Sequence, residues 1–234
     1  MAAWSLAASA LLAVATAAAF AHVARVLRRR SEKHAGRRAL RWFAGFWALC
    51  AAFALVGAAQ LLGAVLDAPL AAFVLARHAQ ILLGCGAVAL LLAYLLHLFT
   101  GREGTLLPAA ALYGVLGAVS VAETARLRPS GVRVTDWRVE LAYAQAPDAF
   151  TLLVLLLVFA PPIVGAVAYA SLWRKAPTRG LRVRIALVSS ALLLWHAGQL
   201  VSRMADSDLW IFATRPLLGL AAAGCVLLAY ARPD

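Results

Sequence analysis

Long apolar runs alternate with short polar segments along the whole chain. Seven runs are long enough to cross a bilayer as a helix, which takes about 17 residues or more. The pattern predicts an all-α integral membrane protein, a single seven-helix bundle that takes up residues 1–234. The predicted spans are residues 3–24, 42–65, 69–99, 105–122, 150–173, 185–201 and 210–230.

The first apolar run is rich in alanine and begins the chain, as a signal peptide would. A signal peptide carries its positive charge before the apolar stretch. Here the charge follows, from Arg25 through Lys33. The order predicts an uncleaved first helix with its N-terminus outside.

The distribution of basic residues predicts the same orientation. With the N-terminus outside, the inner loops and the C-terminal tail hold 15 of the 22 Lys and Arg residues, mostly in Arg25–Arg41 and Arg174–Arg184. Short cytoplasmic loops are enriched in Lys and Arg. The sequence therefore predicts a multi-pass protein of the cell (inner) membrane, N-out and C-in. Tryptophans near the predicted span ends fit interfacial positions; they are Trp42, Trp47, Trp173 and Trp210.

The longest polar segment, Glu123–Asp148, separates the fourth and fifth spans. Apolar residues alternate with polar ones on both sides of Asp136-Trp137, at Val132, Val134, Val139, Leu141 and Tyr143. Alternation with a period of two is typical of strands, so a small β-hairpin over the outer mouth of the bundle is one prediction. An irregular polar loop is the alternative.

Composition narrows the classes of function. The chain is 64% hydrophobic and 14% charged, with a net charge of +12. In a soluble protein such a charge would suggest nucleic acid, but here it lies mainly in loops between spans, so no nucleic-acid partner is expected. Cys50, Cys85 and Cys225 fall inside apolar runs without a metal-ligand spacing, so we expect neither disulfides nor a zinc site.

Basic and amide side chains gather near the outer ends of several spans. On the third span Arg77 and Gln80 are three residues apart and share a helix face, as do His196 and Gln199 on the sixth. One interpretation is a pocket for an anionic or strongly hydrogen-bonding ligand. In the other, the arginines reach the headgroups and the glutamines join helices. The candidate ligand-binding residues are Gln60, Arg77, His78, Gln80, His196, Gln199 and Arg215.

Three further features bear on chemistry and shape. His22 and His97 lie at similar depth near the inner boundary, where they are either interfacial or ligands of haem or metal; we predict no metal site and no cofactor. Pro161-Pro162 should kink or break the fifth span. No acidic residue lies in the middle of a span, which disfavours a proton- or cation-coupled transporter.

Arg77-His78-Ala79-Gln80 resembles the Arg-x-x-Asp at the start of the third helix of the microbial rhodopsins, which also have seven spans and an outer N-terminus. That family holds retinal through a lysine of the seventh span. Here Lys33 and Lys175 are the only lysines, and both lie in predicted inner loops. A covalent retinal of that kind is therefore excluded, and we do not assign the family. By span count alone, the chain is similar to the seven-helix input modules of bacterial sensor kinases.

The sequence favours a sensor or ligand-binding module, with an outer pocket that signals to a protein partner at the inner face. A transporter or channel for a small anionic or neutral solute is an alternative, as is a quinone-, haem- or lipid-binding subunit of a larger complex. We expect no enzyme, because no nucleophile, acid–base and orienting group are recognisable together. The expected partners are the lipid bilayer, a small anionic or polar ligand and an inner-face protein.

Overall fold

A computed structural model describes residues 2–33, 38–135, 137–204 and 208–231 of the chain. Seven helices within these residues are long and apolar enough to cross a membrane, which confirms the predicted all-α membrane bundle. They are α1 (Ala2–Lys33), α2 (Arg38–Val65), α3 (Leu70–Thr100), α4 (Leu106–Arg126), α5 (Ala149–Ser171), α6 (Arg179–Met204) and α7 (Asp208–Ala231). Between α4 and α5 lie two strands, β1 (Pro129–Val134) and β2 (Val139–Tyr143), and single 3-10 turns occupy Glu103–Thr105 and Leu172–Lys175.

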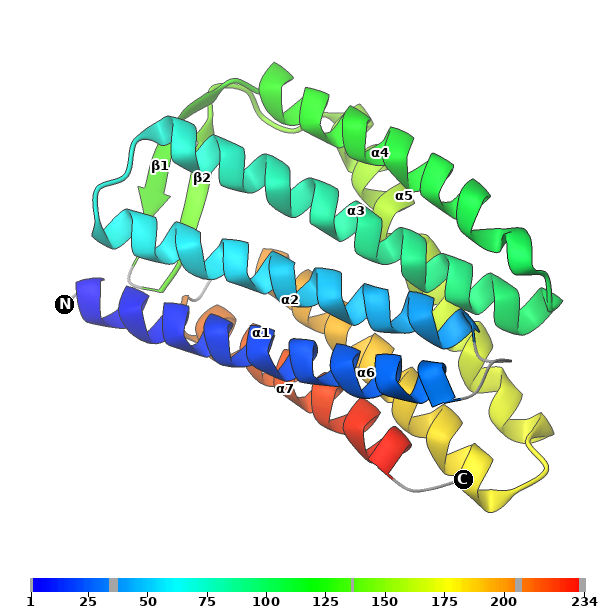
Figure 1. The fold of residues 1–234 in the computed structure, drawn as a ribbon. Coiled ribbons are helices and arrows are strands. Elements are labelled where there is room, and N and C mark those ends of the chain that lie inside the picture. Colours follow the sequence, from blue (N-terminus) through cyan, green and yellow to red (C-terminus); the bar gives the residue numbers. More distant parts are fainter. Residues whose placement is uncertain (1, 34–37, 136, 205–207, 232–234) are drawn as a thin grey trace.

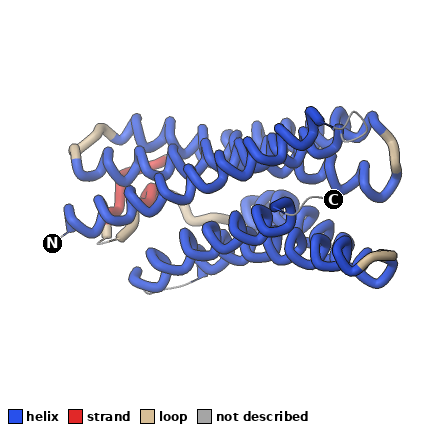
Figure 2. The backbone as a smooth tube through the Cα atoms, turned by 60° about the horizontal axis from the view of Figure 1, so that its bottom comes forward, coloured by secondary structure: helices blue, strands red, loops and turns tan. Residues whose placement is uncertain are grey.

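Helices that follow one another in the chain pack side by side, and α1 packs on α7 while α3 packs on α5 (Figure 1). The strands and the start of α1 lie at one end of the bundle, here called the hairpin end (Figure 2). The end of α1 and the start of α2 lie at the other, here called the basic end. The arginines of these two segments lie there: Arg25, Arg28, Arg29 and Arg30 of α1, and Arg38 and Arg41 of α2.

The helices run further into the polar segments than the predicted spans do. α1 continues to Lys33 and α6 begins at Arg179, so much of both predicted basic loops is helical. Arginine, lysine and glutamate are good helix formers, and Arg28 pairs with Glu32 one turn later at 3.2 Å. Thr178 caps the start of α6 by accepting a hydrogen bond from the Leu181 N–H.

The Pro161-Pro162 pair does not break the fifth helix, contrary to one form of the prediction. α5 is continuous through both prolines, and Pro162 is buried against the bundle. Packing on α3 holds the helix there. A Cβ at Gly165 would lie 2.5 Å from Cδ1 of the buried Leu95, so a larger residue there would force that side chain or the helices to move.

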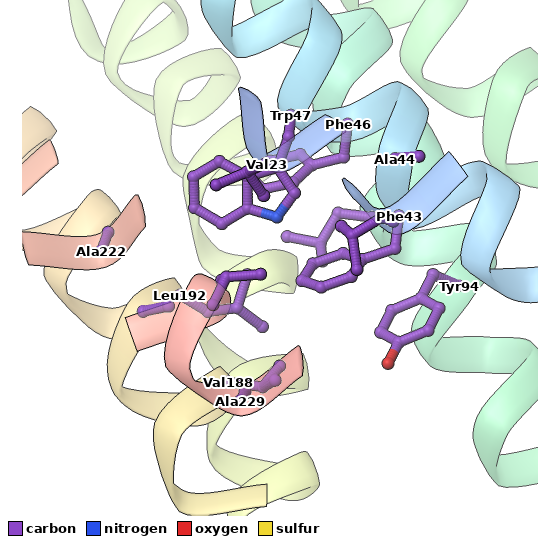
Figure 3. Close-up of a cluster of buried hydrophobic side chains, with 14 of the residues drawn as sticks. Val23, Phe43, Ala44, Phe46, Trp47, Tyr94, Val188, Leu192, Ala222 and Ala229 are labelled. Atoms are coloured by element: carbon purple, nitrogen blue, oxygen red, sulfur yellow. The ribbon is translucent and has the colours of Figure 1, made fainter. Parts of the chain in front are cut away.

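The main hydrophobic core fills the basic half of the bundle (Figure 3). Phe43 stacks on Tyr94 with ring centroids 4.6 Å apart, and Phe20 packs on Trp47 at 5.1 Å. Trp47 is fully buried, so its predicted interfacial position is wrong: the face of α2 that it occupies turns toward α1. Trp173 is exposed, Trp42 is half-buried, and the side chain of Trp210 lies outside the described part.

The strands β1 and β2 form an antiparallel pair, with Val132 opposite Leu141 and Val134 opposite Val139. Backbone hydrogen bonds from Ala144 N–H to Arg128 C=O and from Gln145 N–H to Leu127 C=O close the base of the pair. β1 contacts α3, and β2 contacts α2. The pair therefore crosses the ends of these two helices.

Candidate functional site

A cavity of about 430 Å³ lies at the hairpin end, above the packed core. Its walls come from α1, α2, α3, α6 and α7, and β2 with the preceding turn covers it. The basic half of the bundle is filled with side chains and the hairpin half is hollow, because large and small residues are unevenly distributed along α1 and α2. The large aromatic residues of α1 and α2 lie mostly toward the basic end, whereas the first half of α1 is rich in alanine.

Five of the seven predicted ligand-binding residues line this cavity, from four different helices. They are Gln60, Arg77, Gln80, Gln199 and Arg215. The cavity therefore joins predicted residues that are up to 155 positions apart in the chain, Gln60 and Arg215. The helix ends bring them together because α2, α3, α6 and α7 all reach the hairpin end.

His78 and His196 do not line the cavity. His78 follows Arg77 directly, so its side chain leaves α3 about 100° around the helix from that of Arg77. His196 is buried, and its Nδ1 lies 2.7 Å from the carbonyl oxygen of Leu192 in its own helix. A spacing of three residues from Gln199 was therefore not sufficient to place His196 in the site.

Positive charge predominates on the cavity wall. Among the described residues, Arg77, Arg138 and Arg215 line it, together with one carboxylate, Glu140. Glu140 pairs with Arg138 at 2.6 Å, and that pair is partly exposed. Nε of Arg138 is buried and has no hydrogen-bond partner among the described residues. Guanidinium groups bind anions with short, charge-assisted hydrogen bonds, so the described part of the wall suits an anion.

Aromatic rings form the rest of the wall. Phe53, Trp137, Tyr143 and Trp195 contribute from α2, the hairpin and α6. The guanidinium carbon of Arg215 lies 5.5 Å from the centroid of the Phe53 ring, within the range of a cation–π contact. The ring of Trp195 packs edge-on to the ring of Phe53, with centroids 6.4 Å apart, and to the ring of Phe20, with centroids 5.1 Å apart. One indole therefore belongs both to the cavity wall and to the edge of the core.

Gln80 is buried, with 7% of its surface exposed. Its Nε2 would lie 3.3 Å from a Cβ at Gly57, so the absence of a side chain on α2 leaves room for the amide. A buried amide requires hydrogen-bond partners. With the amides of Gln60 and Gln199 it supplies both donors and acceptors to the cavity.

The turn of the hairpin is attached to α1 across the mouth of the cavity. Oγ of Ser9 donates a hydrogen bond of 3.1 Å to the carbonyl oxygen of Trp137. This contact joins residues 128 positions apart. The hairpin thus reaches from the α4–α5 side to the opposite wall.

An ionic cluster joins the end of α4 to the start of α5, on either side of the hairpin. Arg126, at the end of α4, donates to Glu123 at 2.7 Å and to Asp148 at 2.9 Å. Asp148 caps α5 by accepting the Thr151 N–H at 2.9 Å. This backbone hydrogen bond, assisted by Arg126, lowers the pKa of the Asp148 carboxyl. The cluster therefore favours the ionised form of Asp148.

The predicted histidine pair shows no ligand set. His22 is exposed. Nδ1 of His97 lies 2.9 Å from the carbonyl oxygen of Arg102, and the His97 ring packs edge-on to Trp42. Within residues 2–33, 38–135, 137–204 and 208–231, no three His, Cys, Asp or Glu side chains come close enough to hold a metal ion.

Comparison of the chain with protein-family models, curated proteins and solved structures finds no match. Inferences about the site therefore depend on its own geometry.

Several residues of the site were not among the predicted ones. Among the described residues, the carboxylate on the wall is Glu140 of β2, which the sequence did not single out. Sequence reasoning also missed Arg138, Trp137 and the aromatic walls. The available signal was the adjacent aromatic and basic pair Trp137-Arg138 at the turn of the predicted hairpin.

Proposed function

We propose that the protein is a membrane receptor module that binds a small organic anion with an apolar or aromatic body in the cavity under the hairpin. One observation carries the proposal: among the described residues, three arginines line a cavity that is also walled by aromatic rings. Guanidinium groups recognise carboxylates and phosphates through paired donors. Aromatic walls bury the apolar part of a ligand.

The proposed orientation places the hairpin outside and the basic end inside. It rests on the excess of Lys and Arg at the basic end, in segments short enough for the positive-inside rule. In that orientation the cavity samples the outer aqueous phase. The hairpin, held by Ser9, acts as its lid.

Binding and signalling are favoured over transport because packed aromatic residues close the bundle beneath the cavity. Phe20, Phe43 and Trp47 are fully buried there. A path for a solute would have to separate these side chains. Protein cores are usually packed as densely as crystals of small organic molecules, so such a separation is costly. Binding is also favoured over a reaction, because the described residues of the wall offer recognition groups and no nucleophile paired with a base.

The proposed signal passes from the ligand through Trp195 to the core. Arg215 lies over Phe53, Phe53 packs on Trp195, and Trp195 packs on Phe20. A ligand that moves the Arg215 side chain would change the position of the indole, and thus the packing of α1 on α6. The helical basic ends of α1 and α6 would present that change to an inner-face protein.

The test compares pairs of ligands that differ only in charge. The purified protein in mild detergent is melted with benzoate and with benzamide, and with other carboxylates and their amides. We expect carboxylates to raise the melting temperature and their amides to leave it unchanged. Equal shifts from both members of each pair would contradict the proposed anion site.

Matched variants show whether the cavity is responsible. Arg77→Gln removes one positive charge from the wall, whereas Arg133→Gln removes one from the exposed face of the same hairpin end. We expect the first to lose the carboxylate response and the second to keep it. Equal losses would indicate a general charge effect.

A further inference from the structure

A second cavity lies at the basic end, between α1 and α2. Its volume is about 650 Å³. Three arginines line it, Arg25 and Arg28 from α1 and Arg41 from α2, and all three are exposed. This cavity shares no residue with the one beneath the hairpin.

The cavity changes character along the helix axes. Small residues form its floor, including Ala24 of α1 and Ala44 and Ala48 of α2. Ala48 is seven residues beyond Arg41, which places it about 10 Å deeper along α2. Ala48 is also exposed, so the floor opens to the side of the bundle. The result is a groove that is cationic at the helix ends and apolar further in.

The charge of the groove favours an anion. Among the described residues, Glu32 is the carboxylate that lines it, and its Oε1 pairs with Nε of Arg28 at 3.2 Å. Both side chains of that pair are largely exposed, so the pair is weak and an incoming phosphate can compete with it. Three guanidinium groups against one carboxylate leave an excess of positive charge.

We propose that this groove binds one anionic phospholipid. Its phosphate would contact the guanidinium groups of Arg28 and Arg41, and an acyl chain would lie over the alanine floor. Basic pockets between membrane helices at the cytoplasmic side recognise anionic headgroups. A free phosphate would use only the arginines and would leave the apolar floor without a role. The floor belongs to two candidate membrane spans, Trp4–Glu32 and Ala39–Val65, and therefore lies at the depth of the acyl chains of the bilayer. The cation-to-apolar gradient along these helices matches a phospholipid.

Native mass spectrometry of the purified protein in mild detergent tests the proposal. The protein is supplied with phosphatidylglycerol or phosphatidylcholine with the same acyl chains, and the bound lipid is counted. We expect wild type to retain one phosphatidylglycerol at least about fivefold more than phosphatidylcholine. Equal retention of both lipids would overturn the proposal.

A matched pair of triple variants separates the groove from general surface charge. The first removes the groove cations (Arg25→Gln, Arg28→Gln and Arg41→Gln), and the second removes three exposed cations at the same end (Arg174→Gln, Lys175→Gln and Arg179→Gln). We expect at least about tenfold weaker retention in the first and less than about twofold change in the second, since each juxtamembrane cation adds about fivefold. Equal losses would overturn the proposal.

A variant without any charge change tests the floor. Ala48→Leu fills the groove and faces lipid, where leucine is well tolerated, so the protein should fold normally. We expect it to weaken phosphatidylglycerol retention while leaving the response to carboxylates at the hairpin end intact. Unchanged retention, or displacement of the lipid by millimolar inorganic phosphate alone, would show that the arginines bind phosphate without an acyl chain and would overturn the lipid assignment.

Discussion

Replacement of Arg215 by leucine is the sharpest test of the cavity under the hairpin. Arg215 lies on α7, is half-buried, and places its guanidinium carbon 5.5 Å from the centre of the Phe53 ring. A hydrogen bond to a charged partner contributes about 1.5–3 kcal/mol. Arg215→Leu should therefore weaken the binding of a carboxylate ligand by about 10- to 150-fold.

The same change should affect the empty protein much less. Arg215 is the second residue of its candidate span, Thr214–Ala231, so its guanidinium costs less than the about 2.5–3.5 kcal/mol that an arginine costs at mid-depth. Leucine carries no such cost, but it loses the contacts of Arg215, among them the cation–π contact with Phe53 of about 0.5–1 kcal/mol. We therefore expect the melting temperature of the ligand-free variant to lie close to that of wild type.

Two companion variants separate charge from geometry. Arg215→Lys keeps the charge but lacks the planar pair of donors, so it should restore only part of the affinity. Phe53→Leu keeps the guanidinium but removes the ring beneath it, with an expected loss of about two- to fivefold. Isothermal titration with benzoate measures all four proteins. If all bind within about twofold of one another, Arg215 is not part of the ligand site.

Further expectations follow from the orientation, the packing and the base of the hairpin. A cysteine at Ser130 should react with an impermeant maleimide in intact cells and one at Pro177 should not; the reverse pattern would invert the proposed orientation. All-trans retinal should give no borohydride-stable adduct on α7, which contains no lysine, and a labelled α7 peptide would refute this. Gly165→Ala should destabilise the bundle by about 1–3 kcal/mol, since its Cβ would lie 2.5 Å from a buried leucine of α3, whereas Gly114→Ala, which meets no atom within 4 Å, should not. Because its pKa is lowered in the folded protein, Asp148 should add stability above about pH 4 that is lost as the pH falls through its folded pKa; Asp148→Asn should remove that acid-side loss in thermal melts.

Most of the fold could be predicted from the sequence because a bilayer allows few solutions. Apolar runs of sufficient length must become helices, and seven such runs become seven helices. The ends of the helices were less predictable. The apolar run of the first span ends at Ala24, but the helical hydrogen bonds continue beyond it. α1 therefore extends through several arginines to Lys33. Similarly, Pro161-Pro162 suggested a break that the packing of α5 on α3 prevents.

The candidate site was predictable only where polarity contrasted with an apolar surrounding. Arg77, Gln80 and Arg215 stood out because polar groups in a span are costly. Trp195 and Phe53 did not, since an aromatic residue in a membrane helix is equally consistent with core, lipid or ligand. Glu140 and Arg138 were not identified because they belong to the hairpin, whose position over the cavity depends on the long-range contact with Ser9.

That contact between Ser9 and Trp137 has a consequence for how the protein is made. A membrane chain is synthesised from its N-terminus, so α1 enters the bilayer long before the hairpin exists. In the proposed orientation, the hairpin can cover the cavity only after the α4–α5 segment has crossed the membrane, and the cavity wall is complete only once α7 with Arg215 has been made. Ribosome-bound chains that end before α7 should thus insert and span the membrane yet lack the ligand site, which would make ligand binding a late marker of complete synthesis.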